Sequence, residues 1–219
     1  MKIVVPVKSN STRVPNKNFR PFFKEDSLYD LRMKKLIKVF NPSDIFVSSE
    51  DADVAKNAEK YGVNFILRDV KLTRNEIGMS EVIESITDQI NLMPDEDFVW
   101  SQVTEPFFDE ISESMELWEK NKDKFDSLVA VQRMSDFLIN ESGMPCNFHY
   151  GPWHRPSQEL SKMYVLPFSF MVLKGEALRY CRYYIGQNPY LHEYKGLMVD
   201  IDDEEDFKLA QTLYNAISL

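Results

Sequence analysis

The sequence predicts an α/β fold in which a mainly parallel sheet is covered by helices on both faces. Short apolar runs typical of buried strands alternate with longer stretches of helical periodicity along most of the 219 residues. Alternation of this kind favours parallel strands joined by helical crossovers. The composition, 43% hydrophobic and 28% charged, is that of a globular chain able to bury a sizeable core. We therefore expect one α/β domain.

The individual elements follow from the apolar runs, which indicate strands, and from the stretches of helical periodicity, which indicate helices. The first run, Ile3 to Val7, is apolar without alternation, as in a strand buried on both faces. Predicted strands span Lys2–Val7, Ile45–Ser48, Asn64–Leu67, Phe98–Gln102, Ser127–Val131, Val165–Leu173 and Leu197–Ile201. Predicted helices span Ser27–Val39, Ala52–Tyr61, Met79–Leu92, Glu110–Lys120, Gly175–Tyr180 and Glu204–Ile217.

Residues 133–162 interrupt this alternation. The segment is rich in Gly, Pro and aromatic residues and has no clear period. A long irregular insert with many aromatics rarely stays unpacked, so we expect it to be functional or docked on a partner.

Charge and hydropathy exclude several classes of protein. The formal net charge of −9 argues against non-specific nucleic-acid binding. The longest apolar stretch, Met163–Leu173, is far shorter than the ~20 residues of a membrane span. Pro6 and Lys8 interrupt the first apolar run, unlike a signal peptide. With only two cysteines, the sequence predicts a cytoplasmic protein without membrane or nucleic-acid partners.

A basic loop follows the first predicted strand. Lys8, Arg13 and Lys17 lie in it, and no acidic residue precedes Glu25. Ligands of open α/β sheets bind at the carboxyl ends of strands, so this loop is a candidate site for a polyanion. No glycine occurs before residue 62, so phosphates would be held mainly by side chains. On composition alone, a solvated basic surface remains the simpler alternative.

The order of residues in the loop resembles the signature of the acylneuraminate cytidylyltransferases, the CMP-sialic acid synthetase family. Matching residues are Ser11, Arg13, Val14, Pro15, Lys17 and Asn18, while Lys8 occupies a position where the family usually has Arg. Two later segments are also similar to family motifs: Val47–Asp51, and Trp100–Phe107, in which Gln102, Thr104 and Pro106 match. Arg68 fits a further family position. For Asp51 a helix cap, and for Arg68 a surface ion pair, are the structural alternatives.

An acidic segment, Val199–Phe207, begins within the last predicted strand. Side chains alternate along a strand, so Asp200 and Asp202 are expected on one face, where two ionised carboxylates repel unless a hard cation joins them. The alternative is a set of acids at a helix N-terminus, which explains Asp203 to Asp206 but not Asp200. We predict that Asp200 and Asp202 bind Mg²⁺ or Mn²⁺ and that Asp203 caps the helix. The family has Asp-Ile-Asp here.

The resemblance implies a nucleotide-diphospho-sugar transferase fold, Rossmann-like, and an enzyme that makes a CMP-sugar and pyrophosphate from CTP and an acidic sugar. It implies nucleotide binding by Lys8, Ser11, Arg13, Lys17, Asn18 and Ser49, with Lys8, Arg13, Lys17 and Asp202 as the catalytic residues. Sugar-side residues are Gln102, Thr104, Arg155 and Gln158. No residue is assigned as a general base, and the sugar is not identified.

The resemblance also implies a homodimer in which the insert, residues 133–162, reaches a second subunit. Two other functions stay open. A metal-dependent glycosyltransferase explains the Asp pair but not the first loop. A non-catalytic nucleotide-binding relative is suggested by the missing loop glycines and by Pro167–Phe168, which replace a small-residue pattern in the family.

Overall fold

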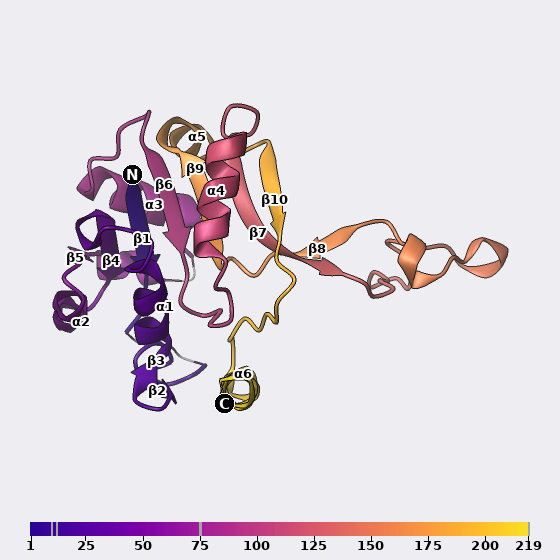
Figure 1. Cartoon of the computed structure of the whole chain (residues 1–219), viewed down its shortest axis with the longest axis horizontal. Coiled ribbons are helices and arrows are strands. Elements are labelled where there is room, and N and C mark those ends of the chain that lie inside the picture. The colour runs from indigo at the N-terminus through magenta and orange to yellow at the C-terminus, as the bar shows by residue number, and fades with distance from the viewer. Residues whose placement is uncertain (10, 12, 75, 219) are drawn as a thin grey trace.

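The alternating elements form one mixed sheet with helices on both faces, which confirms the predicted fold class (Figure 1). The computed structural model describes residues 1–9, 11, 13–74 and 76–218. The strand order is β10-β7-β9-β6-β1-β4-β5, and β8 pairs with β7. The strands of this sheet are β1 (Lys2–Pro6), β4 (Ile45–Ser49), β5 (Asn64–Leu67), β6 (Asp97–Ser101), β7 (Ser127–Met134), β8 (Met163–Val165), β9 (Phe170–Lys174) and β10 (Pro189–Glu193).

The helices divide between the two faces according to the alternation of side chains along the central strands. On β1, Ile3 and Val5 belong to the apolar cluster that also contains residues of α1 (Leu28–Leu36) and α4 (Ile111–Asn121). Val4 points to the opposite cluster, with α3 (Met79–Gln89) and α5 (Gly175–Cys181). All three β1 residues are fully buried, which explains the continuous apolar run of this strand.

Two further helices and a small hairpin complete the fold. Helix α2 (Ala55–Lys60) follows β4, and α6 (Glu204–Ile217) ends the chain. The hairpin of β2 (Pro21–Phe23) and β3 (Asp26–Ser27) packs on α6, with the rings of Phe22 and Phe207 in edge-to-face contact at 5.3 Å between centroids. Within the described residues, no helix is both long and apolar enough to cross a membrane.

The start of α1 is fixed by a polar cluster around the buried Asp30. Ser27 caps the helix, and its side chain and that of Asp30 form a reciprocal capping box. Lys60 Nζ and Tyr61 Oη donate to Asp30 Oδ1 at 2.7 and 2.6 Å. Burial alone would raise the pKa of Asp30, but the hydrogen bonds from Lys60, Ser27 and Tyr61 lower it to about 2. The cluster therefore joins α1 to α2.

Two of the predicted strands differ from the structure. Leu197–Ile201 is not a strand: the Ile201 amide donates to the Thr104 carbonyl at 3.0 Å, but the segment forms no ladder. The structure has an edge strand elsewhere, β10, which was not predicted. It pairs with β7 and places His192 opposite Ala130. The sequence of β10 mixes polar and apolar residues and gave no strand signal. The segment is a strand because its backbone pairs with β7.

The predicted strand Val165–Leu173 is two strands, β8 and β9. They are separated by a bend in which Phe168 has a φ of 54°, a left-handed conformation that no strand tolerates. Strand β8 continues the pairing of β7 away from the main sheet, with Arg133 opposite Tyr164. Residues 135–162, which we call the arm, extend from this hairpin and project away from the sheet (Figure 1).

Candidate active site

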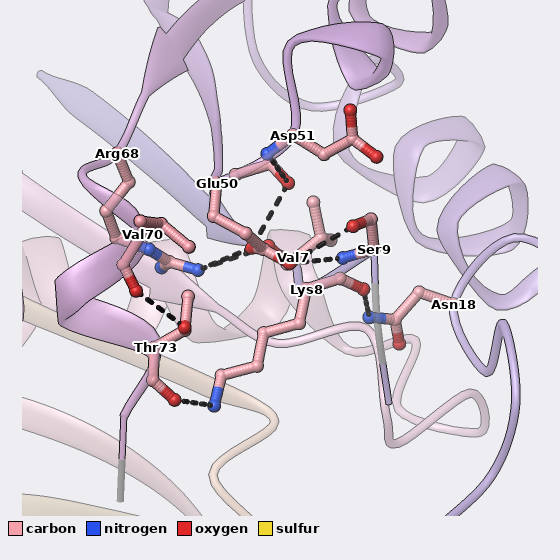
Figure 2. A network of polar contacts seen from close by, with 10 residues as sticks. Val7, Lys8, Ser9, Asn18, Glu50, Asp51, Arg68, Val70 and Thr73 are labelled. Carbon is pink, nitrogen blue, oxygen red and sulfur yellow. Dashed lines mark hydrogen bonds and ion pairs between the residues drawn. The ribbon is translucent and has the colours of Figure 1, made fainter. Parts of the chain in front are cut away.

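The first loop leaves the carboxyl end of β1 and is stabilised by contacts to neighbouring loops. Because β1, β4 and β6 are parallel, the segments after them meet at one edge of the sheet. Lys8 Nζ donates to the Thr73 carbonyl at 3.2 Å, and Asn18 donates to the Lys8 carbonyl at 2.9 Å (Figure 2). Ser11 Oγ accepts from the Val14 amide at 3.4 Å. The Asn18 side chain thus holds the backbone of Lys8 in place, whereas Lys8 as a residue is exposed.

A carboxylate, Glu50, anchors the start of this loop. Its Oε1 accepts from the amide and hydroxyl of Ser9 at 2.9 and 3.1 Å, and its Oε2 accepts from Arg68 at 3.3 Å (Figure 2). Desolvation lowers the pKa of Arg68, and the charge of Glu50 opposes that change. The Ser9 amide is therefore engaged by protein rather than free for a phosphate, consistent with a loop that would bind phosphates through side chains.

The burial of Arg68 corrects one expectation from the sequence, and the contacts of Asp51 confirm another. The side chain of Arg68 is 4% exposed, so the surface ion pair considered from the sequence is wrong. Ser49 is buried, accepts from the Asp51 amide at 3.3 Å and lies beside Glu50. Asp51 caps the short 3-10 turn Ala52–Val54, so the cap expectation for Asp51 is confirmed.

The cations of the first loop meet the acidic segment that precedes α6. Arg13 forms an exposed ion pair with Asp202 at 2.8 Å. Lys17 is buried, and its Nζ donates to the Ile201 carbonyl at 2.5 Å. Asp203 accepts from two amides of α6 in a capping box with Asp206, so the predicted cap is confirmed. The fold thus joins residues nearly two hundred positions apart in the sequence.

Electrostatics link Lys17 to both predicted metal ligands. Burial lowers the pKa of Lys17, while the charges of Asp202 and Asp200 raise it in part. For Asp200, desolvation is the main cause of a raised pKa, and Asp202 and Asp206 add to it; the Thr104 hydroxyl and Lys17 oppose the change. Asp200 and Asp202 are therefore close enough to repel, as predicted, although an irregular segment and not a strand carries them.

The loop after β6 holds this irregular segment in position. Glu105 is fully buried: its Oε1 accepts from the amides of Phe107 and Val199 at 3.2 Å, and its Oε2 from that of Phe108 at 2.7 Å. The Thr104 carbonyl accepts from Ile201, as noted above. These bonds flank Asp200 on both sides and replace the sheet ladder that the sequence suggested for this segment.

Two cations on α1, the buried Arg32 and the half-buried Lys35, complete this polar core. Arg32 donates to the Glu105 carbonyl at 2.5 Å, and Lys35 donates to the carbonyls of Pro106 and Phe108 at 2.6 and 3.0 Å. Desolvation raises the pKa of Glu105, opposed chiefly by the charge of Arg32. Desolvation, together with the nearby charge of Arg32, lowers the pKa of Lys35 to about 8.

The predicted sugar-side residues do not form one group in a single chain. Gln102 is half-buried just beyond β6, and the Thr104 side chain interacts with Asp200, whose pKa it lowers. Arg155 and Gln158 lie in the arm, where Arg155 pairs with Glu159 at 3.2 Å. Because the arm projects from the sheet (Figure 1), one chain does not bring these two residues to the first loop.

Sequence reasoning missed Glu50 and the Glu105 core. A signal for Glu105 was available: it is the one acid between Val103 and Phe108, in a run that is otherwise apolar apart from Thr104. An acid in such a run must find hydrogen-bond partners if it is buried. Two of its amide partners, Phe107 and Phe108, are local. The third, Val199, lies about a hundred residues away along the chain, where no local pattern identifies it.

Comparison with known proteins connects this arrangement to one family. A family model described as cytidylyltransferase matches residues 2–150. No curated protein matches the chain.

Solved structures match the fold over nearly the whole chain. A CMP-2-keto-3-deoxy-manno-octonic acid synthetase, solved with CTP, has a TM-score of 0.66 at 12% identity and covers 100% of this chain and 99% of its own. A putative glucose-1-phosphate thymidylyltransferase from Bacillus anthracis has a TM-score of 0.65 at 15% identity, with coverages of 97% and 94%. A cytidylyltransferase from Leptospira borgpetersenii has a TM-score of 0.61 at 13% identity, with coverages of 98% and 86%. At these identities the likeness establishes the fold.

Proposed function

Because the chain belongs to the cytidylyltransferase family, we propose that it transfers CMP from CTP to an acidic sugar and releases pyrophosphate. The resemblance of the first loop to the acylneuraminate cytidylyltransferases supports this finer assignment. The observation that carries the proposal is the meeting of Arg13 and Lys17 with Asp200 and Asp202 at one edge of the sheet.

In this proposal the cations bind the nucleotide. A sugar hydroxyl attacks the α-phosphorus, the bond to the β-phosphate oxygen breaks, and pyrophosphate leaves. Lys8, Arg13 and Lys17 hold the triphosphate and offset the charge that grows on the leaving group. Because Arg13 is exposed and, among the described residues, forms an ion pair only with Asp202, it exchanges a surface ion pair of low value for a phosphate at little cost.

The donor set beside Lys17 fits a hard divalent cation. Asp200 and Asp202 offer carboxylate oxygens, the ligands that Mg²⁺ and Mn²⁺ prefer, and Asp200 is destabilised as an anion by desolvation and by its acidic neighbours. We propose that these two residues hold the metal, which when bound would neutralise phosphate charge. Thr104 and Glu105 keep the ligand-bearing segment in place.

The proposed acceptor side includes the arm of a second copy of the chain. Several large apolar side chains of the arm are exposed, among them Trp153 at 73% and Met144 at 60%. A projecting hairpin with such a surface is only marginally stable alone, which supports a homodimer with two-fold symmetry. In that dimer Arg155 and Gln158 would reach the sugar side of the partner's site, together with Gln102 of the first chain.

The test is pyrophosphate release from CTP in the presence of a panel of acidic sugars: sialic, legionaminic, pseudaminic and keto-deoxy acids. Stoichiometric CMP-sugar and pyrophosphate with at least one sugar supports the proposal, and Lys17→Ala is the matched variant of the phosphate site. Transfer from a preformed nucleotide sugar would instead indicate a glycosyltransferase. CTP binding without turnover on any acceptor would indicate a non-catalytic relative.

A further inference from the structure

A second cluster of metal-binding side chains lies between α4 and β10. Glu110, Glu113 and His192 present one ligand atom each, and these three atoms lie within 4.8 Å of one another. His192 is 5% exposed, Glu110 is half-buried and Glu113 is exposed. The cluster uses neither the first loop nor the acidic segment before α6.

The hydrogen bonds around His192 define which nitrogen faces the carboxylates. Ser114 Oγ donates to the Glu110 carbonyl at 2.8 Å and lies 2.9 Å from His192 Nδ1. A hydroxyl has one proton, so when it is donated to the carbonyl, Nδ1–H must donate to Ser114 Oγ. We infer this tautomer from the network. The other nitrogen, Nε2, then points to Glu110 Oε2 at 2.9 Å.

A neutral imidazole in this tautomer places a lone pair against a carboxylate, which is repulsive. Either a proton or a cation must lie between Nε2 and Glu110. A proton on Nε2 compensates Glu110 but leaves the Glu113 carboxylate close by, and within the described residues neither glutamate pairs with a Lys or Arg. A divalent cation compensates both carboxylates and uses the Nε2 lone pair.

We propose that Glu110, Glu113 and His192 bind a divalent transition metal of the Zn²⁺ type. One imidazole with two carboxylates suits Zn²⁺ or Co²⁺ better than Mg²⁺, which prefers oxygen ligands alone. Ser114 fixes the ring orientation from the second nitrogen, as outer partners of metal-binding histidines commonly do. Binding would need a rotation of the exposed Glu113 side chain, since zinc requires a ligand distance of roughly 2 Å.

The metal would join α4 to the sheet edge. Strand β10 is the edge strand and pairs only with β7 in the described sheet. Ligands from the start of α4 and from His192 would hold this edge strand against the helix. The site is structural in this proposal, and it does not depend on the proposed cytidylyl transfer.

Zn²⁺ and Co²⁺ binding to the EDTA-stripped full chain tests the proposal. The background is the Asp200→Asn/Asp202→Asn double variant, which removes the other acidic pair. We expect one bound equivalent by calorimetry, a Co²⁺ absorption band, and a Tm rise of about 5–10 °C at a hundredfold excess of Zn²⁺ over Kd.

Glu113→Gln is the decisive variant, because this side chain is exposed and its replacement is expected to leave the fold intact. It should weaken Zn²⁺ binding at least tenfold, and His192→Gln should abolish it. Glu116→Gln, which changes an exposed acid of the same helix paired with Lys120, should leave the affinity unchanged. Absence of saturable binding, or equal affinity in Glu113→Gln and the parent, would overturn the proposal and leave His192 and Glu110 as an ion pair.

Discussion

Replacing Glu105 with Ala should destabilise the protein more than any surface change of similar size. The side chain is fully buried, and its carboxylate accepts from the amides of Phe107, Phe108 and Val199. Each buried amide left without an acceptor costs about 1–3 kcal/mol, although water can enter the cavity and recover part of this. The variant also removes the charge that compensates the fully buried Arg32.

The expected loss is about 4 kcal/mol, within the 3–5 kcal/mol typical of breaking a buried pair from one side. For a chain of this length, that corresponds to a fall in Tm of about 8–16 °C. Glu105→Gln keeps one acceptor oxygen but turns an amide group toward a backbone donor, so its cost should be about half as large.

Urea unfolding followed by circular dichroism, together with thermal melts at neutral pH, measures both losses. Glu116→Ala is the control: it truncates an exposed glutamate on α4 and should change stability by less than about 0.5 kcal/mol. A loss below about 1 kcal/mol for Glu105→Ala, with an unchanged m-value, would refute the idea that these three amides depend on the carboxylate.

Four further predictions test other parts of the structure. Asp30→Asn should cost about 2 kcal/mol at pH 7, because the folded pKa of about 2 lies below the unfolded value of 3.8. This contribution to stability is present above pH 3.8 and is lost as the pH falls toward 2. The unfolding free energies of the wild type and the variant should therefore converge in acid. Lys17→Ala should lower turnover with CTP at least tenfold, and unchanged kinetics at limiting and saturating CTP would contradict its proposed role. Asp202→Asn should abolish turnover, whereas Asp203→Asn, which keeps a side chain suited to the N-cap, should change stability by less than about 0.5 kcal/mol and spare activity; the reverse order of effects on turnover would overturn the metal assignment. Trp153→Ser in the arm should yield a monomer by light scattering if the arm forms the dimer, and a monomeric wild type would count against that interface.

The sequence alone predicted the α/β class, five of the sheet strands near their observed positions, and the helix caps at Asp51 and Asp203. These features depend on local periodicity and on short-range hydrogen bonds, which a single stretch of chain encodes. Family resemblance in the first loop also identified the residues that meet the acidic segment, although composition alone favoured a solvated surface.

Only the tertiary structure decided how the acidic segment is held. Residues 197–201, apolar apart from Asp200, suggested a strand, but their backbone bonds go to Thr104 and Glu105 in a loop about a hundred residues earlier. Likewise β10 exists because β7 offers it a parallel edge, and its own mixed sequence gave no signal. Long-range partners determine both segments, since a backbone amide satisfied by a distant carboxylate leaves no periodic pattern in the sequence around it.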